Sequence, residues 1–163
     1  GVVKAYCTRV GSGPFPTEDE GEIGEYLREK GGEYGATTGR PRRCGWLDLV
    51  ALSYAVRLNG MDNIALTKLD VLTGFDEIQV CTGYMLKDEL LEAFPTNVNM
   101  LDKVKPVYKT LSGWSEDLGV CRKFEDLPEA ARHYVEFIEE ATRVSVGLIG
   151  VGPQREETII REI

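Results

Sequence analysis

The sequence predicts an α/β fold, in which a mixed and mostly parallel β-sheet is covered by helices. Two runs rich in Val, Ile and Leu, at 63–72 and 144–151, are largely apolar, as in strands buried on both faces. Segments with helical periodicity, clearest at 126–142, alternate with such runs, and this alternation favours parallel pairing. The chain has 163 residues, of which 42% are hydrophobic, enough for one compact domain or a large piece of one.

The first part of the chain is expected to hold one strand and two helices. A short apolar run at 2–10 predicts the strand, and the glycines and prolines of 11–18 predict a fixed irregular loop after it. Residues 20–30 have the pattern of a polar helix that a pair of glycines ends. Residues 46–58 are apolar nearly all round, which predicts a helix buried on most sides.

Strands alternate with one long helix in the remainder of the chain. We expect strands at 63–72, 77–85, 144–151 and 158–160. Between 86 and 120 the pattern weakens to short β pieces joined by long loops, which indicates a small antiparallel region. Residues 126–142 predict an amphipathic helix with Pro128 in its first turn.

Composition and charge argue against several classes of protein. A net charge of −8 and a pI near 4.8 disfavour nucleic-acid binding, which usually needs a basic face. No apolar run reaches membrane-spanning length, and no signal-peptide pattern is present, so we expect a cytoplasmic protein without membrane contacts. The cysteines form no CxxC pair and there is one histidine, so no zinc site is predicted, and the size and composition of the chain disfavour a disulfide framework. We expect four free thiols, at Cys7, Cys44, Cys81 and Cys121.

A glycine-bounded loop at 35–43 is the first candidate site. It carries two threonine hydroxyls and the guanidinium groups of Arg40, Arg42 and Arg43, which together with free backbone N–H groups could bind an anion. We expect these arginines near the N-terminus of the helix at 46–58, where the helix dipole also favours anions. A solvated basic loop that offsets acidic helices is an equally good interpretation of this segment alone.

The tetrapeptide Thr67-Lys68-Leu69-Asp70 is the second candidate site, at the expected end of a strand. The Asp70 carboxylate could accept two adjacent hydrogen bonds, from guanine N1–H and N2–H2, which adenine cannot offer. Lys68 would lie on the same strand face and pack its stem along the base. The backbone at 150–152 could form a wall on the other side of the base. An ordinary strand end and a plain turn are the alternatives.

Several motifs in the chain resemble adenylosuccinate synthetase. They are the segments 5–18, 33–40, 46–48, 66–72, 111–114 and 152–153. They occur in the family's order, cover essentially the whole chain, and correspond to the C-terminal part of that enzyme. The resemblance implies that residues 1–163 are the C-terminal portion of a P-loop-NTPase-like fold, with its mostly parallel sheet and a small antiparallel region.

The resemblance also implies an activity. The family joins IMP and L-aspartate to form adenylosuccinate, with GTP as co-substrate and Mg²⁺ as cofactor, and releases GDP and phosphate. GTP first phosphorylates the 6-oxygen of IMP, and the aspartate amine then displaces the phosphate. The family is usually a homodimer, which implies a second copy of the full-length chain as a partner.

Site residues follow from the resemblance position by position. The residues implied to bind aspartate or IMP are Val10, Gly11, Ala36, Thr37, Thr38, Gly39, Arg40, Pro41 and Arg42. The residues implied to bind GTP are Arg42, Lys68, Leu69, Asp70, Gly150, Val151 and Gly152. The chain departs from the family at Pro41, where arginine is frequent, and at Gly150, where serine is frequent.

The family's phosphate loop, its catalytic aspartate and histidine, and its magnesium ligands lie in the N-terminal part and have no counterpart in this sequence. We therefore expect no catalytic residue and no metal ligand in this chain, and no catalysis by the chain alone. Two other functions stay open from sequence. One is a stand-alone guanine-nucleotide-binding module, and the other is a non-catalytic interaction domain that keeps the fold.

Overall fold

The computed structural model describes residues 1–161, and the chain divides into two compact units. The first, called here the sheet unit, comprises Gly1–Ala5, Ala55–Ile78 and the chain from Thr110 onward. The second, called the loop unit, comprises Tyr6–Tyr54 and Gln79–Lys109. Each unit therefore combines segments that lie far apart in the sequence.

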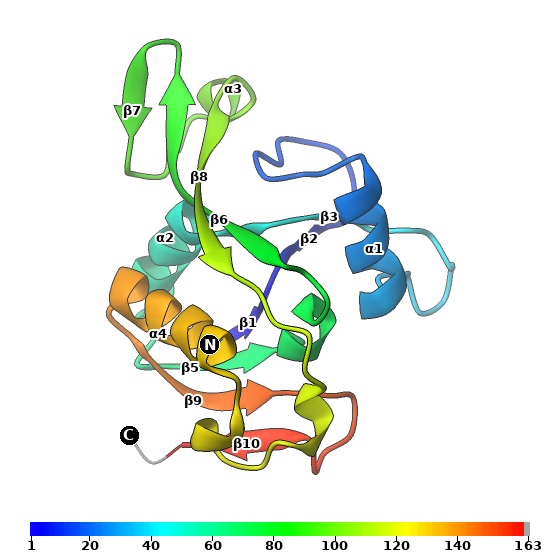
Figure 1. Cartoon of the computed structure of the whole chain (residues 1–163). Helices are drawn as coiled ribbons and strands as arrows, with labels where there is room; N and C mark the ends of the chain where they lie inside the picture. The colour runs from blue at the N-terminus through cyan, green and yellow to red at the C-terminus, as the bar shows by residue number, and fades with distance from the viewer. Residues whose placement is uncertain (162–163) are drawn as a thin grey trace. The chain divides into compact units, whose positions relative to one another are not determined.

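The sheet unit is built on four strands (Figure 1). In spatial order they are β1 (Val2–Lys4), β5 (Asn63–Thr67), β9 (Ser145–Gly150) and β10 (Thr158–Ile160). β5 runs parallel to both of its neighbours, and β10 runs antiparallel to β9. The prediction of a mixed, mostly parallel sheet is therefore confirmed.

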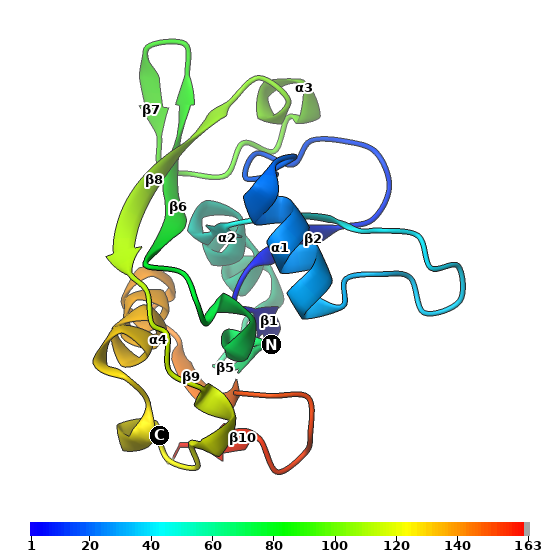
Figure 2. The same cartoon turned by 45° about the vertical axis from the view of Figure 1, so that its right-hand side comes forward.

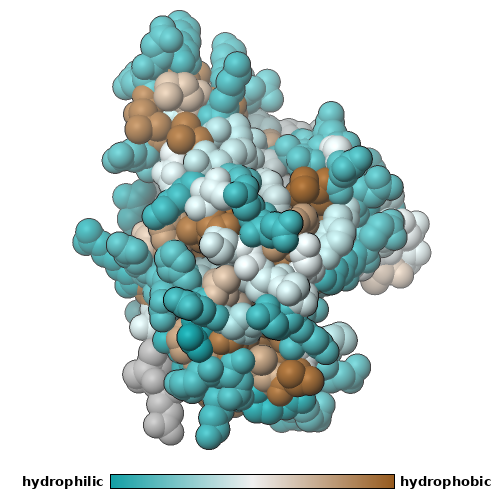
Figure 3. Space-filling view, in the orientation of Figure 1, coloured by the Kyte–Doolittle hydropathy of each residue, from teal (hydrophilic) through white to brown (hydrophobic). Residues whose placement is uncertain are grey.

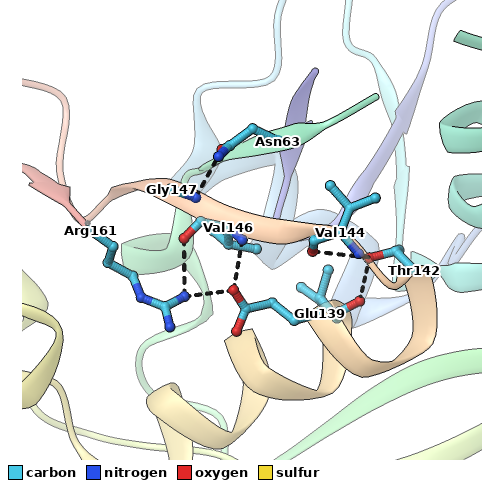
Figure 4. Close-up of polar contacts among 8 residues, drawn as sticks. Asn63, Glu139, Thr142, Val144, Val146, Gly147 and Arg161 are labelled. Carbon is cyan, nitrogen blue, oxygen red and sulfur yellow. Dashed lines mark hydrogen bonds and ion pairs between the residues drawn. The ribbon is translucent and has the colours of Figure 1, made fainter. Parts of the chain in front are cut away.

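A β-bulge in β9 sets which side chains reach the core. Val146 and Ile149 are both fully buried although they are three residues apart, a spacing that would place them on opposite faces of a regular strand. Gly147 is an extra residue between them, because the register with β5 shifts at that point. Its N–H donates to Asn63 Oδ1 over 3.1 Å (Figure 4), and its carbonyl accepts from the Arg161 backbone N–H over 2.9 Å. The bulged backbone is thus fully hydrogen-bonded.

Helix α4 (Glu129–Thr142) packs along the sheet, as both cartoon views show (Figures 1 and 2). Its buried face comprises Ala131, Tyr134, Val135, Ile138 and Thr142. On its rim, Glu139 Oε1 accepts from Val146 N and from Arg161 Nη1, each over 2.7 Å (Figure 4). The helix is therefore tied both to the start of β9 and to the residue after β10. It begins later than predicted, because Pro128 is its N-cap rather than part of its first turn.

The loop unit contains two small groups of strands. β2 (Cys7–Arg9) pairs antiparallel with β3 (Arg43–Gly45), and α1 (Glu22–Gly31) packs against β3. β6 (Glu77–Leu86) pairs parallel with β4 (Leu47–Asp48) and antiparallel with β7 (Glu89–Leu91), and it also pairs with β8 (Lys105–Ser112). A short helix, α3 (Val98–Leu101), precedes β8. Helix α2 (Leu49–Asn59), β6 and β8 contribute residues to both units.

In the first part of the chain, the predicted bounds of two elements were wrong. The strand expected at 2–10 is two short strands, because the two halves pair with different partners, β1 with β5 and β2 with β3. The helix expected at 46–58 starts only at Leu49, because residues 47–48 pair with β6 as β4. Asp48 then caps the helix, and its Oδ1 accepts from Ala51 N over 3.0 Å.

The strand expected at 63–72 ends at Thr67, and Leu69–Leu72 form a 3₁₀ turn, η1. The other two 3₁₀ turns, η2 (Leu118–Val120) and η3 (Phe124–Asp126), lie before α4. All four cysteines are free thiols as predicted, three of them buried, and burial raises the pKa of Cys81 to about 12. Among the described residues, no helix combines the length and the hydropathy that a membrane crossing requires.

Candidate functional site

The backbone of the 35–43 segment folds into a closed loop. Gly35 N–H donates to Arg40 O over 2.9 Å, and Gly39 N–H donates to Gly35 O over 2.8 Å. Gly39 has a φ of 63°, which a residue with a Cβ rarely adopts. The side chains between these bonds, from Ala36 to Arg40, are all exposed. The loop therefore has a fixed base and a polar tip that presents two hydroxyls and one guanidinium group.

The three arginines of this segment have three different environments. Within residues 1–161, the Arg40 side chain is exposed and has no hydrogen-bond or ion-pair partner. Arg42 donates from Nη1 to Glu33 Oε2 over 2.6 Å and keeps 31% of its side chain exposed. Arg43 forms an ion pair with Glu18, and this hydrogen bond raises the pKa of Arg43. Only Arg40 fits the description of a solvated arginine.

Arg43 also holds the glycine loop that carries Val10 and Gly11. Its Nη1 donates to Gly11 O over 3.1 Å and to Gly13 O over 2.8 Å. Val10 is 73% exposed, and Gly11 has a φ of 82°. Arg43 had no role from sequence, and its contacts show a structural one, because it joins the loop after β2 to the strand that follows the arginine segment.

The expected position of these arginines at a helix N-terminus was wrong. Arg43 is the first residue of β3, and β4 follows before α2 starts at Leu49, so the arginines do not belong to the first turn of that helix, where its dipole acts. Arg40 provides the positive charge at the tip of the loop. The ion pairs of Arg42 and Arg43 with their acidic partners hold the base of the loop.

The guanine candidate also differs in detail from its prediction. Lys68 has a φ of 61° and a ψ of 34°, so the chain leaves the extended conformation there. Lys68 and Asp70 therefore do not share a strand face, and Asp70 lies inside η1. Two backbone bonds hold the turn, Val71 N–H to Lys68 O and Thr73 N–H to Asp70 O. A left-handed residue that is not glycine is uncommon and is enriched at binding sites.

The end of β9 lies beside this turn. A Cβ built on Gly150 would be 3.5 Å from Thr67 Cα and 3.7 Å from Lys68 N. The structure thus brings together the segments 67–70 and 150–152. Leu69 and Val151 are 0% and 1% exposed, so both residues are packed in the core beside this turn.

Two neighbouring elements brace the guanine candidate. Trp114 Nε1 donates to Thr73 Oγ1 over 3.0 Å, and Gly74 N–H donates to Trp114 O over 2.8 Å, directly after η1. Glu157 closes the 150–157 loop, because its carbonyl accepts from Val151 N over 2.9 Å and its Oε2 from Gln154 N over 2.7 Å.

Sequence reasoning gave no role to the acids that anchor these segments. They are Glu18, Glu33 and Glu157. For Glu18 and Glu33 the available signal was charge balance, because three arginines in four positions need nearby carboxylates if any of them is to be buried, but this signal does not identify which carboxylates pair. Within residues 1–161, no group of three or more His, Cys, Asp or Glu side chains could hold a metal ion.

The face drawn in Figure 3 is mostly hydrophilic, with hydrophobic residues in small patches, one of them over β6 and β7. In this part of the chain Leu90 and Val98 are 51% and 63% exposed. The polar tip at 36–40 carries no such apolar side chain except the small Ala36. The tip is therefore a polar, exposed surface.

A model of the family described as adenylosuccinate synthetase matches residues 1–159. The chain belongs to the adenylosuccinate synthetase family. The resemblance drawn from the motifs is thereby confirmed over nearly the whole chain.

Individual family members agree with this assignment. The adenylosuccinate synthetase of Halothermothrix orenii is 59% identical over 162 residues, which is 99% of this chain and 38% of that protein. The one from Aquifex aeolicus is 58% identical over 164 residues, 100% of this chain and 38% of that protein. A solved structure of fully ligated adenylosuccinate synthetase from Plasmodium falciparum has a TM-score of 0.94 and 47% identity, covering 99% of this chain and 39% of that one. The chain thus spans about two-fifths of its relatives' length.

Proposed function

We propose that this chain supplies the aspartate and guanine recognition of a GTP-dependent ligase that joins IMP and L-aspartate to form adenylosuccinate, a step of purine biosynthesis. The observation that carries this proposal is the family match over residues 1–159. The activity itself requires the remaining part of a full-length enzyme, because the chain corresponds to only 38% of its curated relatives.

The aspartate ligand is assigned to the loop unit. A dicarboxylate amino acid needs several hydrogen-bond donors and a positive charge, which the tip offers through backbone N–H groups, threonine hydroxyls and Arg40. The residues assigned to aspartate are Ala36, Thr37, Thr38, Gly39, Arg40 and Pro41. Arg40 also lies near the IMP ribose in this assignment, and Val10 and Gly11 lie along IMP.

The guanine base is assigned to the sheet unit. Asp70 accepts from N1–H and N2–H2 of the base, and the Lys68 stem packs along its plane. Gly150, Val151 and Gly152 line the other side of the base, and Leu69, which is buried, lies between the two polar residues. Arg42, from the base of the aspartate loop, contacts the GTP phosphates.

The chemical steps are assigned to the part of the enzyme outside this chain. That part provides the phosphate loop, the residues that transfer protons, and the ligands of Mg²⁺, which neutralises charge during phosphoryl transfer. The side chains described here bind and orient the aspartate, whose amine displaces the phosphate from C6. The assembled enzyme is proposed to be a cytoplasmic homodimer, and the isolated chain is proposed to be inactive.

The test is to express the full-length enzyme that contains this chain and to follow adenylosuccinate formation from IMP, L-aspartate and GTP. The proposal predicts product formation that needs all three substrates, and no product from residues 1–163 alone. A folded full-length enzyme that binds GTP but forms no adenylosuccinate would instead support a guanine-nucleotide-binding module.

A further inference from the structure

Glu33 is a fully buried acid two residues before the 35–43 loop. Its side chain is 0% exposed, and no role was assigned to it from the family's motifs. A buried carboxylate is costly unless charged or hydrogen-bonded groups surround it. Its presence there therefore points to specific partners.

Each carboxylate oxygen of Glu33 has a different partner. The Tyr6 hydroxyl donates to Oε1 over 2.6 Å, and Arg42 Nη1 donates to Oε2 over 2.6 Å. Tyr6 is itself 1% exposed, so its hydroxyl is shielded from water. The acid thus connects a buried phenol to a half-buried guanidinium.

The position of the Tyr6 hydroxyl is fixed by packing. A Cβ built on Gly31, the last residue of α1, would lie 2.1 Å from the Tyr6 hydroxyl oxygen. The hydroxyl therefore occupies the space that any side chain at this position would need. Because Tyr6 is held in place, the Glu33 carboxylate has one orientation, with Oε2 toward Arg42.

Arg42 is also held by its backbone. Its N–H donates to Glu33 O over 2.9 Å, and its carbonyl accepts from Arg28 Nε over 2.9 Å. Together with the Glu33 ion pair, three contacts fix this residue at the base of the loop. The 31% of its side chain that stays exposed is available to a ligand.

We propose that Glu33, oriented by Tyr6, is a positioning residue that presets the Arg42 guanidinium for the phosphates of the nucleotide. This inference rests on the proposed function, in which Arg42 contacts GTP. A free arginine loses rotamer freedom when it binds an anion, and a guanidinium already held on one edge loses less. Glu33 acts through Arg42 and touches no substrate itself.

The test uses the full-length enzyme with Glu33→Gln, which keeps the shape of the side chain but removes the charge that orients Arg42. We expect the KM for GTP to rise about tenfold, with kcat and the KM for IMP changing less than about threefold. Tyr6→Phe keeps the ion pair and removes only the hydroxyl, and it should raise the KM for GTP by about two- to threefold. Glu25→Gln, an exposed acid on α1, is the control of equal charge change.

A double-mutant cycle separates positioning from a general defect. In an Arg42→Leu background, Glu33→Gln should add no further increase in the KM for GTP, because its effect passes through Arg42. An unchanged KM for GTP in both Glu33→Gln and Tyr6→Phe, or the same increase with and without Arg42, would overturn the inference. If the wild-type full-length enzyme forms no adenylosuccinate, the proposed function fails instead. Thermal unfolding of each variant identifies one that does not fold, and Tyr6→Phe then decides the outcome.

Discussion

At the scale of single residues, Asp70 is the residue to which the proposed function assigns the choice of nucleotide base. It lies in η1, braced by the Lys68 and Thr73 backbone bonds, and the proposed function makes its carboxylate the acceptor for two guanine N–H groups. A hydrogen bond to a charged group contributes about 1.5–3 kcal/mol, and N2–H2 is the group that distinguishes GTP from ITP.

Asp70→Asn should therefore lower the preference of the full-length enzyme for GTP over ITP by about tenfold or more. The measurement is kcat/KM for GTP and for ITP at saturating IMP and L-aspartate. Because the substitution changes little volume, stability should stay close to that of the wild type. An unchanged GTP-to-ITP ratio would remove Asp70 from the guanine site.

Substitution by alanine should have different effects on stability at two glycines, Gly150 and Gly113. A Cβ on Gly150 would make ordinary contacts of 3.5 Å or longer, whereas a Cβ on Gly113 would lie 1.8 Å from the Phe75 carbonyl oxygen. Gly150→Ala should change the free energy of unfolding by less than about 1 kcal/mol, and Gly113→Ala should lower it by about 2–4 kcal/mol. Thermal unfolding of the two variants checks this, and equal stabilities would contradict the packing described at Gly113.

The state of a single residue was predictable from the sequence where it depends on the residue type and not on a distant partner. The four free thiols were expected correctly, because the size and composition of the chain disfavour a disulfide framework. The anchoring of Arg42 and Arg43 was not predictable, because their acidic partners lie nine and 25 residues away and only the fold brings them together.

At the scale of elements, the start of α2 depends on one buried carboxylate. Asp48 is 4% exposed, and it accepts from Ala51 N and from the Tyr84 hydroxyl. Burial raises the pKa of Asp48, and its hydrogen bonds with Tyr84 and Ala51 oppose this shift. The acid is thus both a helix cap and a group whose ionisation disfavours the folded state.

The sign of its pH dependence follows from the raised pKa. The folded state binds the Asp48 proton more tightly than the unfolded chain, so this stabilisation is fully present below the unfolded pKa of about 4 and is lost as pH rises through the folded pKa. Relative to Asp48→Asn, the wild type should therefore gain stability as pH falls from 7 toward 4. Denaturant unfolding of both at several pH values measures this difference, and a difference that does not change with pH would contradict it.

Asp48→Ala serves as the companion variant. It removes the cap and leaves the buried Tyr84 hydroxyl without this acceptor, so it should cost about 2–4 kcal/mol at pH 7, clearly more than Asp48→Asn.

Helices and strands were predictable where a regular hydrophobic pattern extends over the whole element. The alternation of strands and helices, the end of α2 and the strand at 158–160 are as expected. The wrong boundaries have different causes, and tertiary pairing that overrides local propensity is one of them. Residues 47–48 form a strand only because β6 lies beside them. Lys68 ends β5 because its backbone is left-handed, a conformation that a lysine in the sequence does not predict.

At the scale of the whole molecule, positive charge is local in an acidic chain. The net charge is −8, yet within residues 1–161 Arg40 is unpaired at an exposed tip of the loop unit, while Arg42 and Arg43 are paired with acids. The division into two units could not be foreseen, because each is assembled from separate sequence segments. The proposed function assigns a different ligand to each unit, with aspartate in the loop unit and guanine in the sheet unit.

The most direct test of this account compares Arg40→Leu and Asp70→Asn in the full-length enzyme by measuring two quantities on both variants, the KM for L-aspartate and the GTP-to-ITP preference. We predict that Arg40→Leu raises the KM for L-aspartate at least about tenfold and leaves the nucleotide preference unchanged, because it removes a charge-assisted contact to a carboxylate. Asp70→Asn should show the reverse pattern. The account is contradicted if Arg40→Leu leaves the KM for L-aspartate unchanged, or if both variants alter both quantities equally.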